Sequence, residues 1–174
     1  YFYSCNNSYY CNYTRKINTE DFTSLAKNFT DNKDFEKAIE YFKKTLELDN
    51  SEAAVHYDLA RAYEQNKQLK EAISHYNSSI KIDTNNAYSY YWRGSAYYDL
   101  KEYEKAKADW LVFNNLKPNA NAINYWLSKV YFETKDTIKA LESIENELKT
   151  NPNNKDAIKL KNSYLERLRD KYST

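Results

Sequence analysis

The sequence is short of the residues from which tight turns are made: it holds one glycine and two prolines in 174 residues. Two-residue hairpin turns need residues that adopt positive φ, and glycine adopts that conformation at the least cost. A chain with a single glycine therefore lacks the material for the many hairpins of an all-β protein. We predict an all-α fold instead.

An excess of charge of one sign is also missing. The 26 lysines and arginines are balanced by 25 aspartates and glutamates, which gives a net charge of +1, and the two signs are interspersed. Nucleic-acid-binding domains carry a basic patch or stripe, and this sequence has none. No apolar run approaches the roughly 20 residues of a membrane-spanning helix. We expect neither a nucleic-acid partner nor a transmembrane segment.

Residues that carry chemistry are equally scarce. The two histidines, His56 and His75, lack a third imidazole for a metal site and a neighbouring serine or cysteine for a catalytic triad. Gly94 is the only glycine, so the chain has no glycine-rich phosphate loop. We expect no metal, no cofactor and no enzymatic activity.

What the sequence has in abundance is a repeat of 34 residues. Such a fixed period indicates one supersecondary unit stacked on copies of itself. Each copy holds an alanine, a small residue, an aromatic residue, a bulky residue and a lysine at corresponding positions. These five columns are Ala38, Ala72, Ala106 and Ala140; Ala26, Ala60, Gly94 and Ser128; Phe29, Tyr63, Tyr97 and Tyr131; Phe42, Tyr76, Trp110 and Ile144; and Lys33, Lys67, Lys101 and Lys135.

One unit, residues 87–120, shows how each copy is built. Apolar residues recur at helical spacing in its first half and again in its second half, and Pro118 ends the pattern. Each unit is therefore predicted to be two antiparallel helices. Small residues such as Gly94 and Ala106 should lie where the two helices approach most closely, with large residues beside them.

The second helices of the four units should differ in the strength of their N-terminal capping. Asp34 and Asp136 are good N-cap residues, whereas Gln68 and Glu102 occupy the same position and are poorer ones. We therefore expect the second helices of the second and third units to fray at their starts.

The pattern resembles the tetratricopeptide repeat, whose signature is W-x2-L-G-x2-Y, then A-x3-F, then P. Residues 90–97 read Tyr-x2-Arg-Gly-x2-Tyr, and Ala106-x3-Trp110 and Pro118 follow. The resemblance implies a right-handed α-solenoid of antiparallel helix pairs. We assign a non-repeat tail to 1–18, four repeats to 19–52, 53–86, 87–120 and 121–154, and a C-terminal capping helix to 155–174.

The family usually has a glycine at the turn between the two helices, where this chain has its column of lysines. A residue other than glycine costs on the order of 1 kcal/mol at positive φ. We expect Asn32 and Asn66 to take part of that conformation in the first two turns, because asparagine tolerates it. A genome rich in adenine and thymine explains the lysines better than a functional role does.

The first helices of a solenoid line its concave face, which is where the resemblance places a ligand. We expect this face to display Tyr57, Asp58, Arg61, Tyr88, Tyr91, Trp92, Tyr98, Tyr125, Trp126, Lys129 and Phe132. Tyr57, Tyr91 and Tyr125 stand 34 residues apart and should form a ladder, although packing alone also explains tyrosines in this column. Trp92 and Trp126 replace residues that are usually polar, and either bind a partner or pack against a neighbouring helix.

The resemblance implies a protein or peptide partner. Some members of the family clamp a C-terminal carboxylate with Lys and Asn; the corresponding positions here have one cation, Lys27, and no asparagine, which disfavours that mode. We predict a non-enzymatic interaction and assembly module that binds an extended aromatic or apolar peptide, with Asp58, Arg61 and Lys129 bonded to the peptide backbone. One alternative is a structural subunit of an extracellular homo-oligomer or fibre, and a third is a glycan-binding surface protein.

Residues 1–18 show neither helical period nor repeat register, and they hold both cysteines, Cys5 and Cys11. The cysteines could form a disulfide in an exported chain, Cys5 could be lipidated, or both could be free thiols. Four asparagines lie in N-x-[ST] sequons and are candidate glycosylation sites: Asn6, Asn12, Asn28 and Asn77.

Methionine is absent, so Tyr1 is not a translation start; either a leader was removed or the sequence lies inside a longer gene product. We expect an extracytoplasmic location (secreted, cell-surface or periplasmic), with the cytoplasm as the alternative. The aromatic tail either enters the groove of a neighbouring copy, which would build a head-to-tail oligomer, or folds back on its own first repeat.

Overall fold

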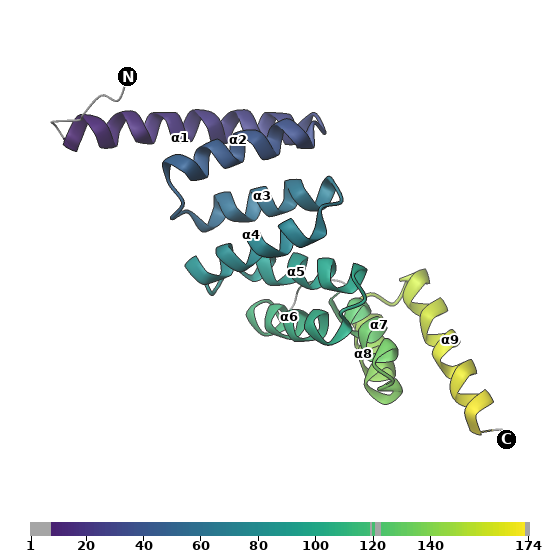
Figure 1. The fold of residues 1–174 in the computed structure, drawn as a ribbon. Coiled ribbons are helices and arrows are strands. Elements are labelled where there is room, and N and C mark those ends of the chain that lie inside the picture. Colours follow the sequence, from purple (N-terminus) through teal and green to yellow (C-terminus); the bar gives the residue numbers. More distant parts are fainter. Residues whose placement is uncertain (1–7, 119, 121–122, 173–174) are drawn as a thin grey trace. The chain divides into compact units, whose positions relative to one another are not determined.

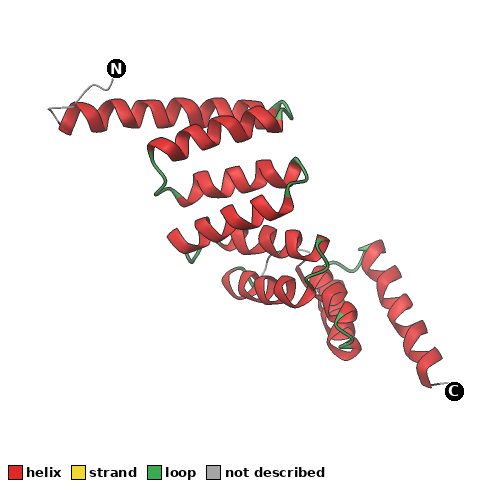
Figure 2. Cartoon of the chain, in the orientation of Figure 1, coloured by secondary structure: helices red, strands yellow, loops and turns green. Residues whose placement is uncertain are grey.

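The computed structural model describes residues 8–118, 120 and 123–172, and for 8–17 and 171–172 it describes the backbone alone. Within these residues the chain forms nine helices joined by short turns (Figures 1 and 2). They are α1 (Ser8–Asp31), α2 (Phe35–Leu48), α3 (Ala53–Gln65), α4 (Leu69–Ile82), α5 (Ala87–Asp99), α6 (Tyr103–Leu116), α7 (Ile123–Glu133), α8 (Thr137–Thr150) and α9 (Lys155–Tyr172). The all-α prediction is confirmed.

The chain divides into two compact units, Tyr1–Ser89 and Tyr90–Thr174. In the first unit α1 packs on α2 and α3 packs on α4, and in the second α7 packs on α8, with α9 after them (Figure 1). Side chains of α5 and α6 also meet in the second unit, where Trp110 bonds to the backbone of Tyr91. Helix pairs therefore follow one another along the chain, as the repeat predicted.

α1 is longer than expected. We found no helical period in residues 1–18, yet the helix begins at Ser8 and runs to Asp31. This segment contains neither glycine nor proline. Once the second half of α1 is fixed against α2, adding further helical residues in front of it costs little, because propagation is far easier than nucleation.

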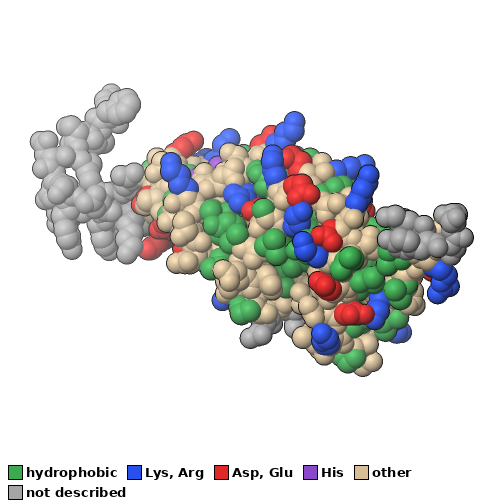
Figure 3. Space-filling model, turned by 90° about the horizontal axis from the view of Figure 1, so that it is seen from below, with side chains coloured by type: hydrophobic (Ala, Val, Ile, Leu, Met, Phe, Trp, Pro, Cys, Tyr) green, Lys and Arg blue, Asp and Glu red, His purple; other side chains and the backbone are tan. Residues whose placement is uncertain are grey.

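The alanine, small-residue and bulky columns of the repeat form the core. The alanines Ala38, Ala72, Ala106 and Ala140 are completely buried, and the bulky column is at most 1% exposed. Outside the core, on the face shown in Figure 3, lysine and arginine side chains are intermixed with aspartate and glutamate, as expected for solvated helix faces.

Small and bulky residues are matched within each repeat, most closely in the third. A Cβ atom on Gly94 would lie 2.7 Å from Nε1 and 2.8 Å from Cδ1 of Trp110. Trp110 is 1% exposed, and its Nε1–H donates to the carbonyl oxygen of Tyr91 at 3.0 Å, so the indole is held in place. The prediction that Gly94 marks a close approach is confirmed, and the largest residue of the bulky column faces the smallest residue of its column.

The four turn lysines adopt the left-handed conformation themselves. Their φ angles are 61° for Lys33, 64° for Lys67, 62° for Lys101 and 66° for Lys135. The expectation that asparagine would share this role is wrong in both turns, because Asn32 is not among the described residues with positive φ and Asn66 has a φ of −81°.

Hydrogen bonds explain why the lysine position takes positive φ. In each turn the lysine N–H and the N–H of the next residue donate to carbonyls of the preceding helix; for example, Lys67 donates to Glu64 at 3.0 Å and Gln68 donates to Tyr63 at 2.9 Å. These are bonds of a helix C-terminus that closes through a left-handed residue, the position where glycine is normally found.

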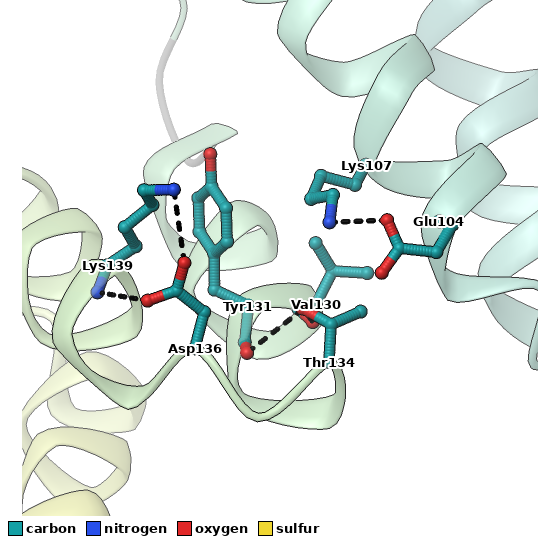
Figure 4. A network of polar contacts seen from close by, with 7 residues as sticks. All are labelled: Glu104, Lys107, Val130, Tyr131, Thr134, Asp136 and Lys139. Carbon is teal, nitrogen blue, oxygen red and sulfur yellow. Dashed lines mark hydrogen bonds and ion pairs between the residues drawn. The ribbon is translucent and has the colours of Figure 1, made fainter.

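The N-caps follow the sequence prediction. Asp34 accepts a hydrogen bond from the backbone N–H of Lys37 at 3.3 Å, and Asp136 accepts one from Lys139 at 3.2 Å. Gln68 and Glu102 make no such bond. Figure 4 shows Asp136 with its second contact, the ammonium of Lys139 at 3.1 Å, beside the ring of Tyr131.

Replacing a turn lysine by glycine should stabilise the protein. We expect Lys33→Gly, Lys67→Gly, Lys101→Gly and Lys135→Gly each to raise the free energy of unfolding by about 0.5–1 kcal/mol, because the left-handed penalty disappears. Urea denaturation followed by circular dichroism measures the change. Lysine-to-alanine variants at the same positions are the control, since alanine keeps the Cβ; equal stabilisation by alanine would show that φ is not the cause.

Gly94→Ala should destabilise the protein although alanine is the better helix former. Overpacking against Trp110 costs about 1–3 kcal/mol, and the helix propensity of alanine offsets about 0.5–1 kcal/mol of it. The double variant Gly94→Ala/Trp110→Tyr recreates the Ala60 and Tyr76 pair of the second repeat and should recover most of the loss. A Gly94→Ala variant as stable as the parent, again by urea denaturation, would contradict the close contact.

Candidate functional site

Charged candidates on α3 are already paired inside the first unit. The carboxylate of Asp58 lies 3.3 Å from the ammonium of Lys27. Burial raises the pKa of Asp58, and Lys27 opposes that rise. Arg61 donates to Glu64 at 2.7 Å, and the same Glu64 oxygen accepts from the hydroxyl of Tyr76 at 2.8 Å. A peptide on this part of the surface would have to share these groups.

The two tyrosine candidates of the first unit differ in exposure. Tyr57 on α3 is half-buried, with its ring centroid 6.2 Å from that of Tyr76. Tyr88, at the start of α5, is 55% exposed. Tyr57 is therefore anchored to a core residue, whereas Tyr88 offers its ring to solvent.

The candidates Tyr98, Tyr125 and Trp126 of the second unit form a connected cluster of rings. Trp126 on α7 lies 5.8 Å from Trp110 and 6.0 Å from Tyr98, measured between ring centroids. Burial raises the pKa of Tyr98 to about 12, so its hydroxyl remains neutral and can donate a hydrogen bond. Trp126 is half-buried, and its contact with buried Trp110 gives it a packing role as well as a partly exposed surface.

Trp92 on α5 contacts the ring of the tyrosine that precedes it. Trp92 meets Tyr91 edge to face, with centroids 4.9 Å apart, and Tyr91 in turn lies 5.0 Å from Phe113. Trp92 is thus attached to the core through Tyr91. The expected ladder is divided between the units, because Tyr57 lies in the first whereas Tyr91 and Tyr125 lie in the second.

Lys129 lies among three aromatic rings. Its ammonium is 4.6 Å from the ring centroid of Trp126, 5.1 Å from that of Tyr98 and 5.7 Å from that of Tyr125. Cations are attracted to the negative faces of aromatic rings at these distances. The rings therefore hold the charge of Lys129 at the surface formed by α5 and α7.

Phe132 on α7 contacts two residues of α9 that were not among the predicted site residues. Its ring stacks on that of Tyr164 from α9, with centroids 4.3 Å apart, and the guanidinium of Arg167 lies 4.8 Å from Phe132. The sequence pattern predicts only a capping role for 155–174. A signal was present, because Tyr164 and Arg167 are one helical turn apart and so share a helix face.

Comparison with known proteins agrees with this architecture. Two tetratricopeptide repeat family models match residues 29–91 and 87–109. The chain is a tetratricopeptide repeat (TPR) protein. TPR domains are generally protein–protein interaction modules, and TPR proteins are typically non-enzymatic scaffolds. No curated protein matches the sequence.

Solved structures share the TPR fold at low sequence identity. A TPR protein from Parabacteroides merdae aligns with a TM-score of 0.81 and 23% identity over 90% of this chain and 62% of that one. PilF of Pseudomonas aeruginosa aligns with a TM-score of 0.74 and 24% identity over 90% and 72%. The first TPR domain of Spaghetti (RPAP3), bound to the HSP90 peptide SRMEEVD, aligns with a TM-score of 0.66 and 21% identity over 68% and 94%.

The third TPR contains a buried ion pair that sequence reasoning missed. Arg93 takes the place of the leucines Leu25, Leu59 and Leu127, and its guanidinium donates twice to the carboxylate of Asp109, at 2.6 and 2.8 Å. The side chains are 17% and 7% exposed. A charge in a leucine column is itself a signal that a partner must lie opposite, because an unpaired buried charge is costly.

Other candidates fall partly outside the described residues. Cys5 and Asn6 lie there entirely, and of Cys11 and Asn12 only the helical backbone is described. Asn28 and Asn77 are both exposed on helices. Within the described part of the chain, no group of three or more metal-binding side chains occurs and no helix is long and apolar enough to cross a membrane.

The two histidines of the second TPR bond to each other. Their Nδ1 atoms are 3.2 Å apart, and Nε2 of His56 lies 3.2 Å from the carbonyl oxygen of Asn50. That carbonyl only accepts, so His56 carries its proton on Nε2 and, when neutral, accepts at Nδ1 from His75. Burial lowers the pKa of both rings, that of His75 to about 4, where the charges of His56 and Lys43 contribute.

The histidine pair predicts a loss of stability in acid. Both folded-state pKa values lie below the ordinary value near 6.5, so the unfolded chain binds more protons and stability falls as the pH drops from about 6.5 towards 4. Solvent screening of the half-buried His75 limits the expected loss to about 1–2 kcal/mol. Urea denaturation at several pH values measures it.

A matched variant isolates the histidines from other titrating groups. His56→Phe/His75→Tyr installs the residues of the first TPR, in which Tyr41 contacts Phe22 and Phe29. The difference in stability between pH 6.5 and 4 should shrink in this variant. An unchanged difference would assign the pH dependence to carboxylates elsewhere.

Proposed function

We propose that this TPR protein is a non-enzymatic adaptor that binds an extended aromatic or apolar peptide. The observation that carries the proposal is the connected set of half-buried rings on α5 and α7, with Lys129 held among them. Aromatic side chains that are anchored on one edge and accessible on the other are enriched at binding hot spots. The peptide-bound TPR domain of RPAP3 supports a peptide as the kind of ligand.

Anchoring explains why these rings suit recognition. Trp126 rests on buried Trp110, and Phe132 rests on buried Tyr164. Side chains that are already ordered before binding lose little conformational entropy when a partner arrives. The surface therefore offers apolar area at a low entropic cost.

Removing Trp92 should weaken peptide binding without unfolding the protein. Peptides selected from a random library by wild-type protein serve as ligands, and fluorescence anisotropy measures affinity. We expect Trp92→Ala and Trp126→Phe to weaken binding, by about thirtyfold for Trp92→Ala if it is a hot spot worth about 2 kcal/mol. Trp126 is changed to Phe and not to Ala because Trp126 also supports Trp110.

Leu111→Ala is the matched control, because Leu111 is 43% exposed on a second helix, α6, away from the candidate residues in sequence. Equal affinity of the Trp92→Ala and wild-type proteins would refute the adaptor. Light scattering on the same variants tests self-assembly: an oligomer that dissociates in Trp92→Ala would favour the structural subunit. Selection of glycans and not of peptides would favour the glycan-binding protein.

A further inference from the structure

A cleft between α7 and α9 in the second unit is lined by an unusual set of charges. It consists of two hollows, of about 380 and 170 Å³, that share Phe132, Glu133 and Arg167. Lys135 lines the larger hollow and Lys129 the smaller one. Three cations and one carboxylate thus line the two hollows, although the whole chain has a net charge of only +1.

The cations of this cleft are not held in ion pairs with any residue that the structure describes. Among the described residues, ion pairs occupy lysines on several helices, including Lys37, Lys105 and Lys139. Within that same part of the chain, Lys129, Lys135 and Arg167 make no ion pair. At this cleft three such cations accompany a single carboxylate, that of Glu133.

Aromatic rings hold two of the cations without using their hydrogen bonds. Arg167 lies 4.8 Å from the centre of Phe132, and Lys129 lies among Trp126, Tyr98 and Tyr125. A guanidinium stacked on a ring keeps its in-plane N–H groups available, and these match the two oxygens of a carboxylate. Donors for an anion are therefore positioned before any ligand binds.

The other residues that line the cleft indicate which residues of a ligand would flank its anionic group. Phe132, Tyr164 and Leu160 line the smaller hollow, and Leu168 lines the larger one. Burial raises the pKa of Tyr164 to about 12, so its hydroxyl adds no negative charge. An acidic side chain flanked by apolar or aromatic residues is complementary to this combination.

We propose that the α7–α9 cleft binds an acidic side chain of the partner peptide, with Arg167 and Lys129 as its ligands. The proposal rests on the proposed function in one respect, namely that the partner is a peptide. Glu133 sets the limit of the site, because its carboxylate repels a second negative charge. The cleft thereby distinguishes an acidic peptide from its uncharged amide counterpart.

Two synthetic peptides test the cleft. Each has eight residues with two adjacent phenylalanines in a glycine and serine background; one carries a glutamate beside them and the other carries a glutamine. Fluorescence anisotropy gives the ratio of their affinities. We expect wild-type protein to prefer the glutamate peptide by about tenfold, since a charge-assisted bond is at stake.

Charge-removing variants locate the effect. Arg167→Gln and Lys129→Gln should bring the ratio close to one, and Glu133→Gln should increase it. Lys159→Gln is the matched control, because Lys159 is an exposed residue of the same helix that lines neither hollow. Circular dichroism confirms that each variant is folded.

The outcomes separate this inference from the adaptor function. If both peptides bind equally to wild-type protein and Trp92→Ala weakens both, the adaptor stands and the acidic site is overturned. A tenfold preference that survives both Arg167→Gln and Lys129→Gln also overturns the site. If neither peptide binds wild-type protein at millimolar concentration, the adaptor and the acidic site are both overturned.

Discussion

The close approach of two helices over a small residue is the constraint on which the rest of the structure depends. Ala38, Ala72, Ala106 and Ala140 are fully buried, and a bulky side chain one helical turn later fills the space beside each of them. Because this contact recurs every 34 residues, it places each first helix in the same way relative to its second helix. The surface residues of α3, α5 and α7 inherit their positions from it.

The same contact couples the core to the candidate surface. Trp110 belongs to the bulky column and faces Gly94, and Trp126 and Tyr98 of the candidate surface rest against the same indole. A larger residue at position 94 would displace Trp110 and, with it, the rings that are available to a partner. Core packing in the third TPR and the positions of the candidate surface rings are therefore coupled. A substitution in this core is expected to affect both.

The period of the sequence predicted the buried columns, the turns and the two side-chain N-caps, because each of these follows from local pattern. It located the left-handed position but assigned part of the strain to asparagine, since intrinsic preference favours asparagine. The hydrogen bonds that close each first helix decide otherwise, and they fall on the lysine. Similarly, no local pattern marked the start of α1 at Ser8, where helix propagation extends the element beyond its packed half.

The candidate surface was harder to predict because it depends on departures from the period. Arg93 breaks the leucine column, and its contact with Asp109 across α5 and α6 explains the exception. Tyr164 and Arg167 lie beyond the last complete TPR, so the repeat could not assign them a place beside Phe132. The repeat predicts the positions of side chains on the helices, but the residues that depart from it give the candidate surface its chemistry.

The charged candidate residues of the two units differ in whether they are already paired with an opposite charge. On α3 the charged candidates are satisfied internally, Asp58 by Lys27 and Arg61 by Glu64. On α7 and α9 the cations lie on aromatic rings, which attract positive charge without neutralising it. An incoming carboxylate would have to displace an existing partner on α3, whereas on the second unit it would find free donors. Electrostatic recognition should therefore centre on the second unit.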